Sequence, residues 1–493
     1  MNGENELPEG WDVVKLPDIV QIIMGQSPPG STYNQRGEGL PFFQGKIDFT
    51  DRHPKIRVFC TEPRKIANRG DILLSVRAPV GPTNIANCTC VIGRGLAALS
   101  PLGGMPTEFI LNYLRLKESE LNASGTGSTF TAISKTVLEE FEIPLPPLAE
   151  QRRIVAAVDL LLARVNASRE RLDRVPGFLK AFRQAVLAAA CSGRLTEGWR
   201  EEHPDVEPAS SILEDNKNQK KIEKIGKKRI LRESDNSTLI ELPEKWLWVK
   251  WGLIGVSQNG RLFPSKEYQS DGVRLLRPGN LDANGKIIWT ENNTRFLPLD
   301  YEKNFPEFVL KPNEIVMNLT AQSLKEEFLG RVCITGNSDH CLLNQRLARL
   351  IPINFSSRYA FWVFKSPHFR KFVDKLNTGS MIQHMFTSQL VEYDFPLPPL
   401  SEQHEIVHRV ESLFALADHI EQRVAIGKER ADRLTQAILA KAFRGELVPT
   451  EAELARIEGR EYESASVLLE RIGKEKNQKN MGKKHVKRTS SDE

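Results

Sequence analysis

The sequence contains one pattern that could bind a catalytic zinc ion. His404 and His408 occupy the two histidine positions of an HExxH pattern, which places both imidazoles on one helix face with a glutamate between them. The chain repeats itself with an offset of 252 residues, and the matching positions of the first copy are Arg152 and Ala156. Neither side chain can bind zinc there. We therefore interpret the pattern as a coincidence on a helix surface and expect no metal site.

A second pattern could hold a nuclease magnesium ion. Asp205, Asp215 and Lys217 have the types and order of a carboxylate–lysine nuclease set. That chemistry needs the second acid and the lysine on a rigid strand beside a phosphate. Here they lie in a polar segment without a strand pattern. No Gly-Lys pair is followed by Ser or Thr, and no NPPY-like or DPPF-like tetrapeptide occurs, so neither a P-loop nor an amino-methyltransferase site is predicted.

Composition sets the class of protein. With 493 residues, 40% apolar and 27% charged, the chain fits a globular protein of about three domains. No apolar run reaches the roughly 20 residues of a membrane helix, and the first residues lack the pattern of a secretory signal. The six cysteines include no CxxC pair. We expect a cytoplasmic protein that contacts no membrane.

An internal duplication organises the chain. Residues 125–195 align without a gap to residues 377–447, with 25 identities in 71 positions, including PLPPL followed by Glu-Gln in both copies. Upstream, LPEGWDVVK at residue 7 resembles LPEKWLWVK at residue 242. The chain is therefore two copies of one unit, each with a variable part of about 140 residues and a better-matched part of about 55.

The better-matched parts predict two long helices. Apolar residues recur every three or four positions over about four heptads, which is typical of a coiled-coil seam. The paired prolines precede each helix, and Gly193 and Gly445 follow the last apolar turn as C-caps. Pro176 should kink the first helix. We expect the two helices to pack antiparallel along these seam positions: Ile154, Val158, Leu161, Val165, Ile406, Val410, Leu413 and Ile420.

The variable parts predict an α+β fold with a twisted sheet. Residues 71–76, 314–319 and 331–334 are short β-type runs bounded by turn residues. Residues 107–117 and 358–376 each indicate a single helix. The fold class is thus α+β, with two globular domains joined by two long antiparallel helices in a pseudo-two-fold repeat.

Charge marks the remaining segments. Residues 217–232 and residues 471–488 each hold eight Lys or Arg and one acid, or +7 each, so the net charge of +5 leaves −9 for the rest. Both segments indicate flexible linkers or tails, and a solvated tail and a phosphate-contacting arm stay equally open. The predicted division is a first domain at 1–146, a helix at 147–195, a basic linker at 196–241, a second domain at 242–398, a helix at 399–447 and a basic tail at 448–493.

This organisation resembles a known family. A variable domain, then PLPPLAEQRRIV leading a heptad helix that ends AVLAAACSGRL, and the whole repeated, is similar to the specificity subunits of type I restriction–modification systems. The resemblance implies that each domain reads one half of a split site in double-stranded DNA. It also implies that the helices set the spacer and bind two methyltransferase subunits, which restriction subunits join. S-adenosylmethionine, ATP and Mg²⁺ would be bound by those partners, and this chain would hold no cofactor and perform no chemistry.

Candidate DNA contacts follow from residue type, because Arg, Lys, Asn and Gln read base edges. In the first domain the candidates lie in a basic stretch and after a predicted strand: Lys46, Arg52, Lys55, Arg57 and Arg77. In the second domain they flank a Pro-Gly turn and form a polar cluster: Arg274, Arg277, Asn280, Asn344, Gln345 and Arg346. The alternative for the whole chain is a non-catalytic coiled-coil adaptor or DNA-binding protein without an active restriction complex.

Overall fold

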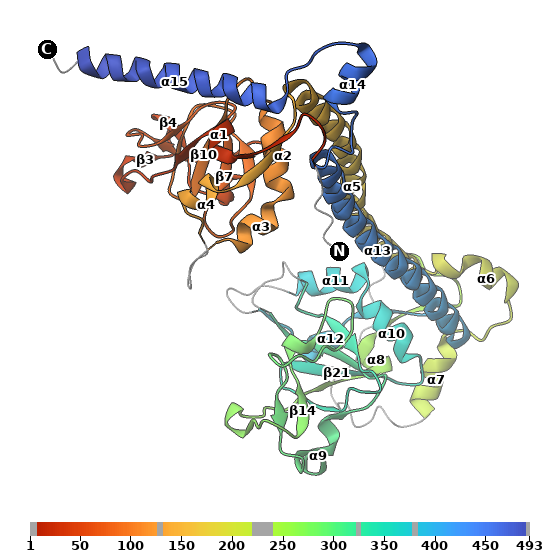
Figure 1. Cartoon of the computed structure of the whole chain (residues 1–493). Helices are drawn as coiled ribbons and strands as arrows, with labels where there is room; N and C mark the ends of the chain where they lie inside the picture. Colours follow the sequence, from red (N-terminus) through yellow and green to blue (C-terminus); the bar gives the residue numbers. More distant parts are fainter. Residues whose placement is uncertain (1–6, 126–131, 219–239, 322–326, 377–382, 490–493) are drawn as a thin grey trace. The chain divides into compact units, whose positions relative to one another are not determined.

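A computed structural model describes residues 7–125, 132–218, 240–321, 327–376 and 383–489 (Figure 1). The chain forms two compact units, and each is described by itself. Unit 1 consists of Met1–Asp173 and Ala425–Glu493, and unit 2 of Arg174–Val424. Both boundaries fall inside the long helices, so each unit contains one variable domain and half of each helix. Within the described residues, no helix is long and apolar enough to cross a membrane.

A four-stranded antiparallel sheet forms the centre of the domain in unit 1. Its strand order is β2-β10-β7-β8, and helix α2 packs on it through Phe109, Ile110 and Leu114, all buried with strand residues in one core (Figure 1). The bounds are β2 (Val20–Met24), β7 (Ile72–Ser75), β8 (Thr83–Ile85), β10 (Leu96–Pro101) and α2 (Thr107–Leu116). The run at 71–76 is thus strand β7, and the helix predicted at 107–117 is α2.

A second sheet adds the loops that later form the site. Its order is β3-β5-β4-β9-β6, with β4 and β9 parallel. These strands are β3 (Tyr33–Asn34), β4 (Leu40–Phe43), β5 (Phe59–Cys60), β6 (Ile66–Ala67) and β9 (Cys90–Ile92). The remaining elements of the domain are β1 (Asp12–Lys15), paired with β11 (Glu142–Leu145), and the short helices α1 (Leu16–Ile19), α3 (Glu118–Ala123) and α4 (Lys135–Glu139).

Unit 2 repeats this topology. Its central antiparallel sheet has the order β13-β21-β17-β19, its second sheet β15-β14-β20-β16, and its ribbon pairs β12 with β23. The strands are β12 (Leu247–Lys250), β13 (Gly255–Asn259), β14 (Val273–Leu276), β15 (Phe296–Leu297), β16 (Val309–Leu310), β17 (Ile315–Asn318), β18 (Thr320–Ala321), β19 (Val332–Ile334), β20 (Cys341–Leu343), β21 (Leu347–Pro352), β22 (Gln383–His384) and β23 (Asp394–Leu397). The runs predicted at 314–319 and 331–334 are therefore β17 and β19.

The helix predicted at 358–376 is wrong as a single element. The structure has two helices, α10 (Ser357–Phe364) and α11 (Pro367–Lys375). The break occurs because the Ser366 hydroxyl accepts a hydrogen bond from the Phe369 amide as an N-cap, and Pro367 occupies the first helical position of α11. Unit 2 also contains the short helices α8 (Trp251–Ile254), α9 (Tyr301–Asn304) and α12 (Thr387–Leu390).

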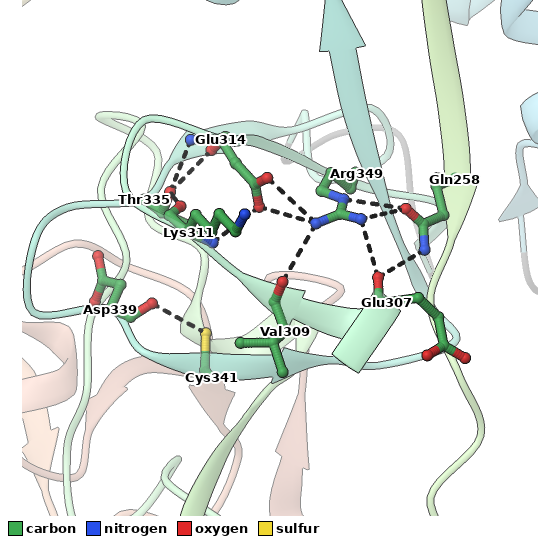
Figure 2. Close-up of polar contacts among 9 residues, drawn as sticks. All are labelled: Gln258, Glu307, Val309, Lys311, Glu314, Thr335, Asp339, Cys341 and Arg349. Atoms are coloured by element: carbon green, nitrogen blue, oxygen red, sulfur yellow. Dashed lines mark hydrogen bonds and ion pairs between the residues drawn. The ribbon is translucent and has the colours of Figure 1, made fainter. Parts of the chain in front are cut away.

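A half-buried polar network distinguishes the central sheet of unit 2. Figure 2 shows the Arg349 guanidinium donating to the Glu314 carboxylate at 3.2 Å, to the Gln258 amide oxygen at 3.1 Å and to the carbonyl oxygens of Val309 and Glu307. Arg349 is on β21 and Gln258 is its cross-strand partner on β13. The network joins strands of both sheets, because Val309 is on β16.

The two long helices are α5 (Leu148–Cys191) and α13 (Leu400–Phe443), which pack together and are antiparallel. In unit 1, Arg169 pairs with Asp432 at 2.7 Å and Asp173 with Lys428 at 2.6 Å, so residue numbers rise along one helix as they fall along the other. Helix α5 is continuous through Pro176. Gly193 and Gly445 both adopt positive φ (77° and 74°) after the helices, as the C-cap prediction requires.

Most of the seam positions lie inside. Ile154, Val158, Val165, Ile406 and Val410 are buried, and Leu161 and Leu413 are partly buried. Ile420 is the exception, with 36% of its surface exposed. Its neighbours Ala417 and Val424 occupy the buried line, which leaves Ile420 at the edge of the seam.

Each long helix begins with a glutamate that is fully buried. Glu150 in unit 1 accepts hydrogen bonds from Trp11 Nε1 at 2.9 Å and from the Glu451 amide at 2.8 Å. Glu402 in unit 2 accepts from Trp246 Nε1 at 2.7 Å, and its other oxygen accepts from Thr196 and Arg200. Burial raises the pKa of Glu150, against the effect of its two hydrogen bonds. Each glutamate therefore fixes the segment that follows the other helix of its unit.

The lysine-rich run 471–488, predicted as a flexible tail, lies in helix α15 (Ala465–Thr489). The wider linker and tail also contain helices α6 (Glu197–Glu202), α7 (Ser210–Asn218) and α14 (Glu451–Glu458). In unit 1, Leu468 and Ile472 are buried in the domain core, and Lys476 Nζ donates to the carbonyl oxygens of Pro17 and Asp18 beside α1 (Figure 1). The sequence analysis missed these buried apolar side chains because lysines surround them in the sequence. Most of the basic run at 217–232 lies outside the described residues.

Candidate nucleic-acid interface

A polar cleft opens at one edge of the domain in unit 1. It has a volume of about 630 Å³. The lining residues lie on β3, at the end of β7 and in the segments after β2, β4, β7 and β9: Ser27, Pro28, Tyr33, Gln44, Gly45, Lys46, Ser75, Arg77, Ala78, Arg94 and Gly95. Gln44 and Lys46 follow β4, Arg77 follows β7, and Arg94 is in the turn between β9 and β10. The cleft is therefore built from loops on a rigid sheet, where a binding surface is expected.

Hydrogen bonds to backbone carbonyl oxygens hold the loops of the cleft in place. The Ser75 hydroxyl donates to the carbonyl oxygens of Arg77 and Pro79, which holds the turn that carries Arg77. The Gly93 amide donates to the Phe43 carbonyl at 2.8 Å, and a Cβ on Gly95 would lie 2.3 Å from the Gln44 carbonyl oxygen. The turn and the loop after β4 can approach this closely because position 95 is glycine.

The cleft is positive. Lys46, Arg77 and Arg94 are exposed, and their side chains make no hydrogen bond or ion pair with another described residue. None of the described residues that line the cleft is acidic. Three cations without acids can neutralise phosphates and donate to base edges, which fits a nucleic-acid ligand.

The structure brings together only some of the predicted contacts of the first domain. Lys46 and Arg77 share the cleft, whereas Arg52 pairs with Glu108 at 2.7 Å. Lys55 and Arg57 are exposed on the same connection as Arg52 and do not line the cleft. Sequence reasoning missed Gln44 and Arg94. The triplet Gly93-Arg94-Gly95 after an apolar run was a signal for a tight turn presenting one cation.

In the second domain, strand β14 carries Arg274, and the loops after β14 and β20 carry the other predicted residues. Arg277 lies with its guanidinium 6.0 Å from the Tyr268 ring, and Gln345 and Arg346 are exposed. Arg274 donates to the Ser338 carbonyl and covers Trp289 at 4.8 Å.

Two predicted asparagines of the second domain lie inside. Asn280 is 1% exposed; its side-chain oxygen accepts from the Arg277 amide, and its amide group donates to the Ile288 carbonyl. Asn344 is 8% exposed and accepts from the Arg346 amide. Both side chains shape turns, since both groups of Asn280 and the side-chain oxygen of Asn344 bond to backbone, and we leave these buried residues out of the DNA-contacting set proposed below.

The two patterns that could do chemistry are placed as follows. His404 and His408 are exposed on α13, Ile406 between them is buried, and Glu405 pairs with Arg409 along the helix. Asp215 and Lys217 are on helix α7, not on a strand. Among the described residues, no group of three or more His, Cys, Asp or Glu side chains could hold a metal ion.

The buried thiols are poor nucleophiles. Burial raises the pKa of Cys90, Cys191, Cys333 and Cys341 to about 12. These thiols are therefore protonated at neutral pH, and the thiolate is the nucleophilic form.

Comparison with known proteins agrees with this architecture. A family model described as the type I restriction modification DNA specificity domain matches residues 8–175 and again residues 243–426. The specificity subunit of the type I restriction enzyme EcoDI from Escherichia coli is 28% identical over 475 residues, 96% of each chain. That of EcoBI, also from Escherichia coli, is 31% identical over 492 residues, covering 97% of this chain and 94% of the relative.

A solved structure shares the fold. The crystal structure of the HsdS subunit from Thermoanaerobacter tengcongensis is 19% identical, with a TM-score of 0.51 over 90% of this chain and 99% of the other. The two family matches together span well over half of the sequence, and each falls on one copy of the repeat. The chain therefore belongs to the specificity subunits of type I restriction–modification systems.

Proposed function

We propose that each unit reads one half of a bipartite double-stranded DNA site for a type I restriction–modification complex. The observation that carries this proposal is the positive, acid-free cleft of unit 1, whose loops have counterparts on the same strands of unit 2. Base edges in a major groove are read by arginine, lysine and amide side chains, which the cleft presents. Two related reading domains in one chain suit a target with two unlike halves.

The long helices would fix the spacer between the half-sites and recruit two methyltransferase subunits. In support, several large apolar side chains of the helices are exposed to solvent, including Phe178, with 69% of its surface exposed, and Leu416, with 53%. Exposed apolar residues on a helix pair fit a protein partner. Restriction subunits would join through this complex.

The chain itself would perform no chemistry and bind no cofactor. S-adenosylmethionine would be held by the methyltransferase subunits, and ATP and Mg²⁺ by the partner subunits. The charge of −9 outside the two lysine-rich segments favours partners that supply further phosphate-neutralising groups. We propose a cytoplasmic location, because the complex would act on genomic DNA.

A base-resolution methylome tests the proposal. Cells with this chain and its methyltransferase partner are compared with cells that lack only this chain. We expect a split motif, methylated on both strands, that disappears in the deletion. If methylation is the same in both strains, a coiled-coil adaptor or a DNA-binding protein without an active complex becomes the better explanation.

Two engineered chains separate the roles of domains and helices. Replacing the first variable domain with that of a relative should change one half of the motif only, whereas a change in both halves would contradict modular reading.

Inserting four residues at the midpoint of both α5 and α13 adds about 6 Å, so the spacer should lengthen by about one to two base pairs. An unchanged spacer would argue against a ruler.

A further inference from the structure

Backbone pairing aligns the cleft loops of unit 1 with those of unit 2 residue by residue. The parallel pair β4–β9 places Phe43 opposite Ile92, and the parallel pair β14–β20 places Leu276 opposite Leu343. The Gly93 amide donates to the Phe43 carbonyl, and the Asn344 amide donates to the Leu276 carbonyl in the same way.

Two positions of this frame carry exchanged side chains. The residue after Phe43 is Gln44, and the residue after Leu276 is Arg277. Arg94 lies two residues after Ile92, and Gln345 lies two residues after Leu343. Unit 1 therefore presents glutamine from the first loop and arginine from the second, and unit 2 presents arginine from the first loop and glutamine from the second.

The surroundings of the pair match at one tyrosine position and differ at Gly95, whose counterpart in unit 2 is Arg346. In unit 1 the two loops touch through Gly95, and Tyr33 lines the same cleft. Asn34 lies opposite Phe59 in unit 1, and Gln269 lies opposite the equivalent Phe296 in unit 2. The residues that precede Asn34 and Gln269 are Tyr33 and Tyr268, which therefore occupy equivalent positions. Arg277 approaches the Tyr268 ring. An amide and a guanidinium thus occupy the same frame in opposite order.

The free donors of these side chains indicate base reading. Gln44, Arg94 and Gln345 are exposed, and their side chains make no hydrogen bond or ion pair with another described residue. Arginine bonds in bidentate fashion to guanine O6 and N7, and glutamine to adenine N6 and N7. The competing explanation is phosphate contact, which positions the protein but carries no sequence information.

We propose that positions 44/94 and 277/345 are the purine-reading pairs of the two domains, with guanine and adenine read in opposite order in the two half-sites. Arg94 reads a guanine in the first half-site, and Gln345 reads an adenine at the equivalent place of the second. This assignment rests on the proposed function and names the bases that the cleft of unit 1 and the equivalent loops of unit 2 recognise.

The test is the methylation motif of three single variants in the intact complex: Arg94→Gln, Gln345→Arg and the control Arg36→Gln. Arg36 is exposed and pairs with Glu38 away from the cleft, so its replacement should leave the motif unchanged. Arg94→Gln should relax or convert one guanine of the first half-site to adenine, with discrimination shifting by about 10- to 100-fold and the second half-site unchanged. Gln345→Arg should convert one adenine of the second half-site to guanine.

Binding of the purified complex to oligonucleotides separates reading from phosphate contact. The proposal predicts that Arg94→Gln weakens binding to guanine-containing sites and not to sites with adenine at that position. Uniform weakening across all sequences, with a smaller salt dependence, would overturn it in favour of phosphate contact. A wild-type complex that methylates a split motif lacking guanine in the first half would overturn the assignment alone. A wild-type complex without any split motif would overturn the proposed function as well.

Discussion

The central sheets of the two units have the same strand order but opposite chemistry at one cross-strand pair. In unit 1 the pair is Ile23 and Ala98, and in unit 2 the corresponding pair is Gln258 and Arg349. Unit 1 packs apolar side chains there, whereas unit 2 builds the Arg349 network onto Glu314. Topology and register are therefore retained while the side chains on the frame are exchanged, in the central sheet as well as in the loops.

Removing the arginine of unit 2 should have the largest effect. Arg349→Ala leaves the acceptors on Glu314, Gln258, Val309 and Glu307 without this donor, and at about 1 kcal/mol for each hydrogen bond the loss is about 4 kcal/mol. Six of the seven tryptophans lie in unit 2 and only Trp11 in unit 1, so tryptophan fluorescence during urea unfolding follows unit 2. The double variant Gln258→Ile with Arg349→Ala restores the chemistry of unit 1 and should recover part of the loss. A double variant less stable than Arg349→Ala would contradict the equivalence of the two pairs.

The buried glutamates at the helix starts should come next, and their effects should differ. Glu402→Ala removes the carboxylate partner of Arg200 and leaves the Trp246 indole without its acceptor in unit 2, and it should cost about 2–4 kcal/mol, because hydrogen bonds to charged groups are the stronger ones. Glu150→Ala orphans only the Trp11 indole and one amide, which costs about 1–2 kcal/mol. Urea unfolding of the two variants provides the measurement. Equal losses would show that the arginine of unit 2 adds nothing.

The helix-ending glycines should break both units alike. Gly193 has a φ of 77° and a Cβ there would lie 2.5 Å from Pro243, and Gly445 has a φ of 74° with Pro8 at 2.4 Å. Either change to alanine should cost about 1–3 kcal/mol through backbone strain and the displaced proline. Thermal unfolding of both variants checks this expectation. A harmless Gly445→Ala beside a damaging Gly193→Ala would show that the two C-caps are not equivalent.

The smallest effects are expected inside the long helices. Gly177 in α5 has open space around it, so Gly177→Ala should stabilise unit 2 by up to about 1 kcal/mol through helix propensity. A Cβ on Gly427 in α13 would lie 3.1 Å from a Leu172 methyl, so Gly427→Ala should gain less in unit 1. Calorimetry of the two variants ranks the gains. A larger gain in stability from Gly427→Ala than from Gly177→Ala would mean that the Leu172 side chain can move away from the new methyl group and that the seam is loosely packed at this point.

The sequence alone was sufficient for the repeated architecture. The duplication, the seam period and the capping glycines are local patterns, and local patterns predicted α5, α13, β7 and β17 correctly. It was insufficient where one residue interrupts a period, as Ser366 and Pro367 do between α10 and α11. It was also misleading in the tail, because the lysines of α15 concealed Leu468 and Ile472, which pack in the core.

The alternation of two related domains with two long seamed helices can be predicted from the amino-acid sequence, because periodicity and repetition are properties of the chain. Which side chains share a cleft depends on the folded structure. Residues 44 and 94 are fifty positions apart, and strand pairing brings their loops into contact through Gly95. Burial likewise depends on the fold: Asn280 and Asn344 have the residue types of DNA contacts, but both are buried, and their side-chain oxygens accept from the backbone of the turns around them.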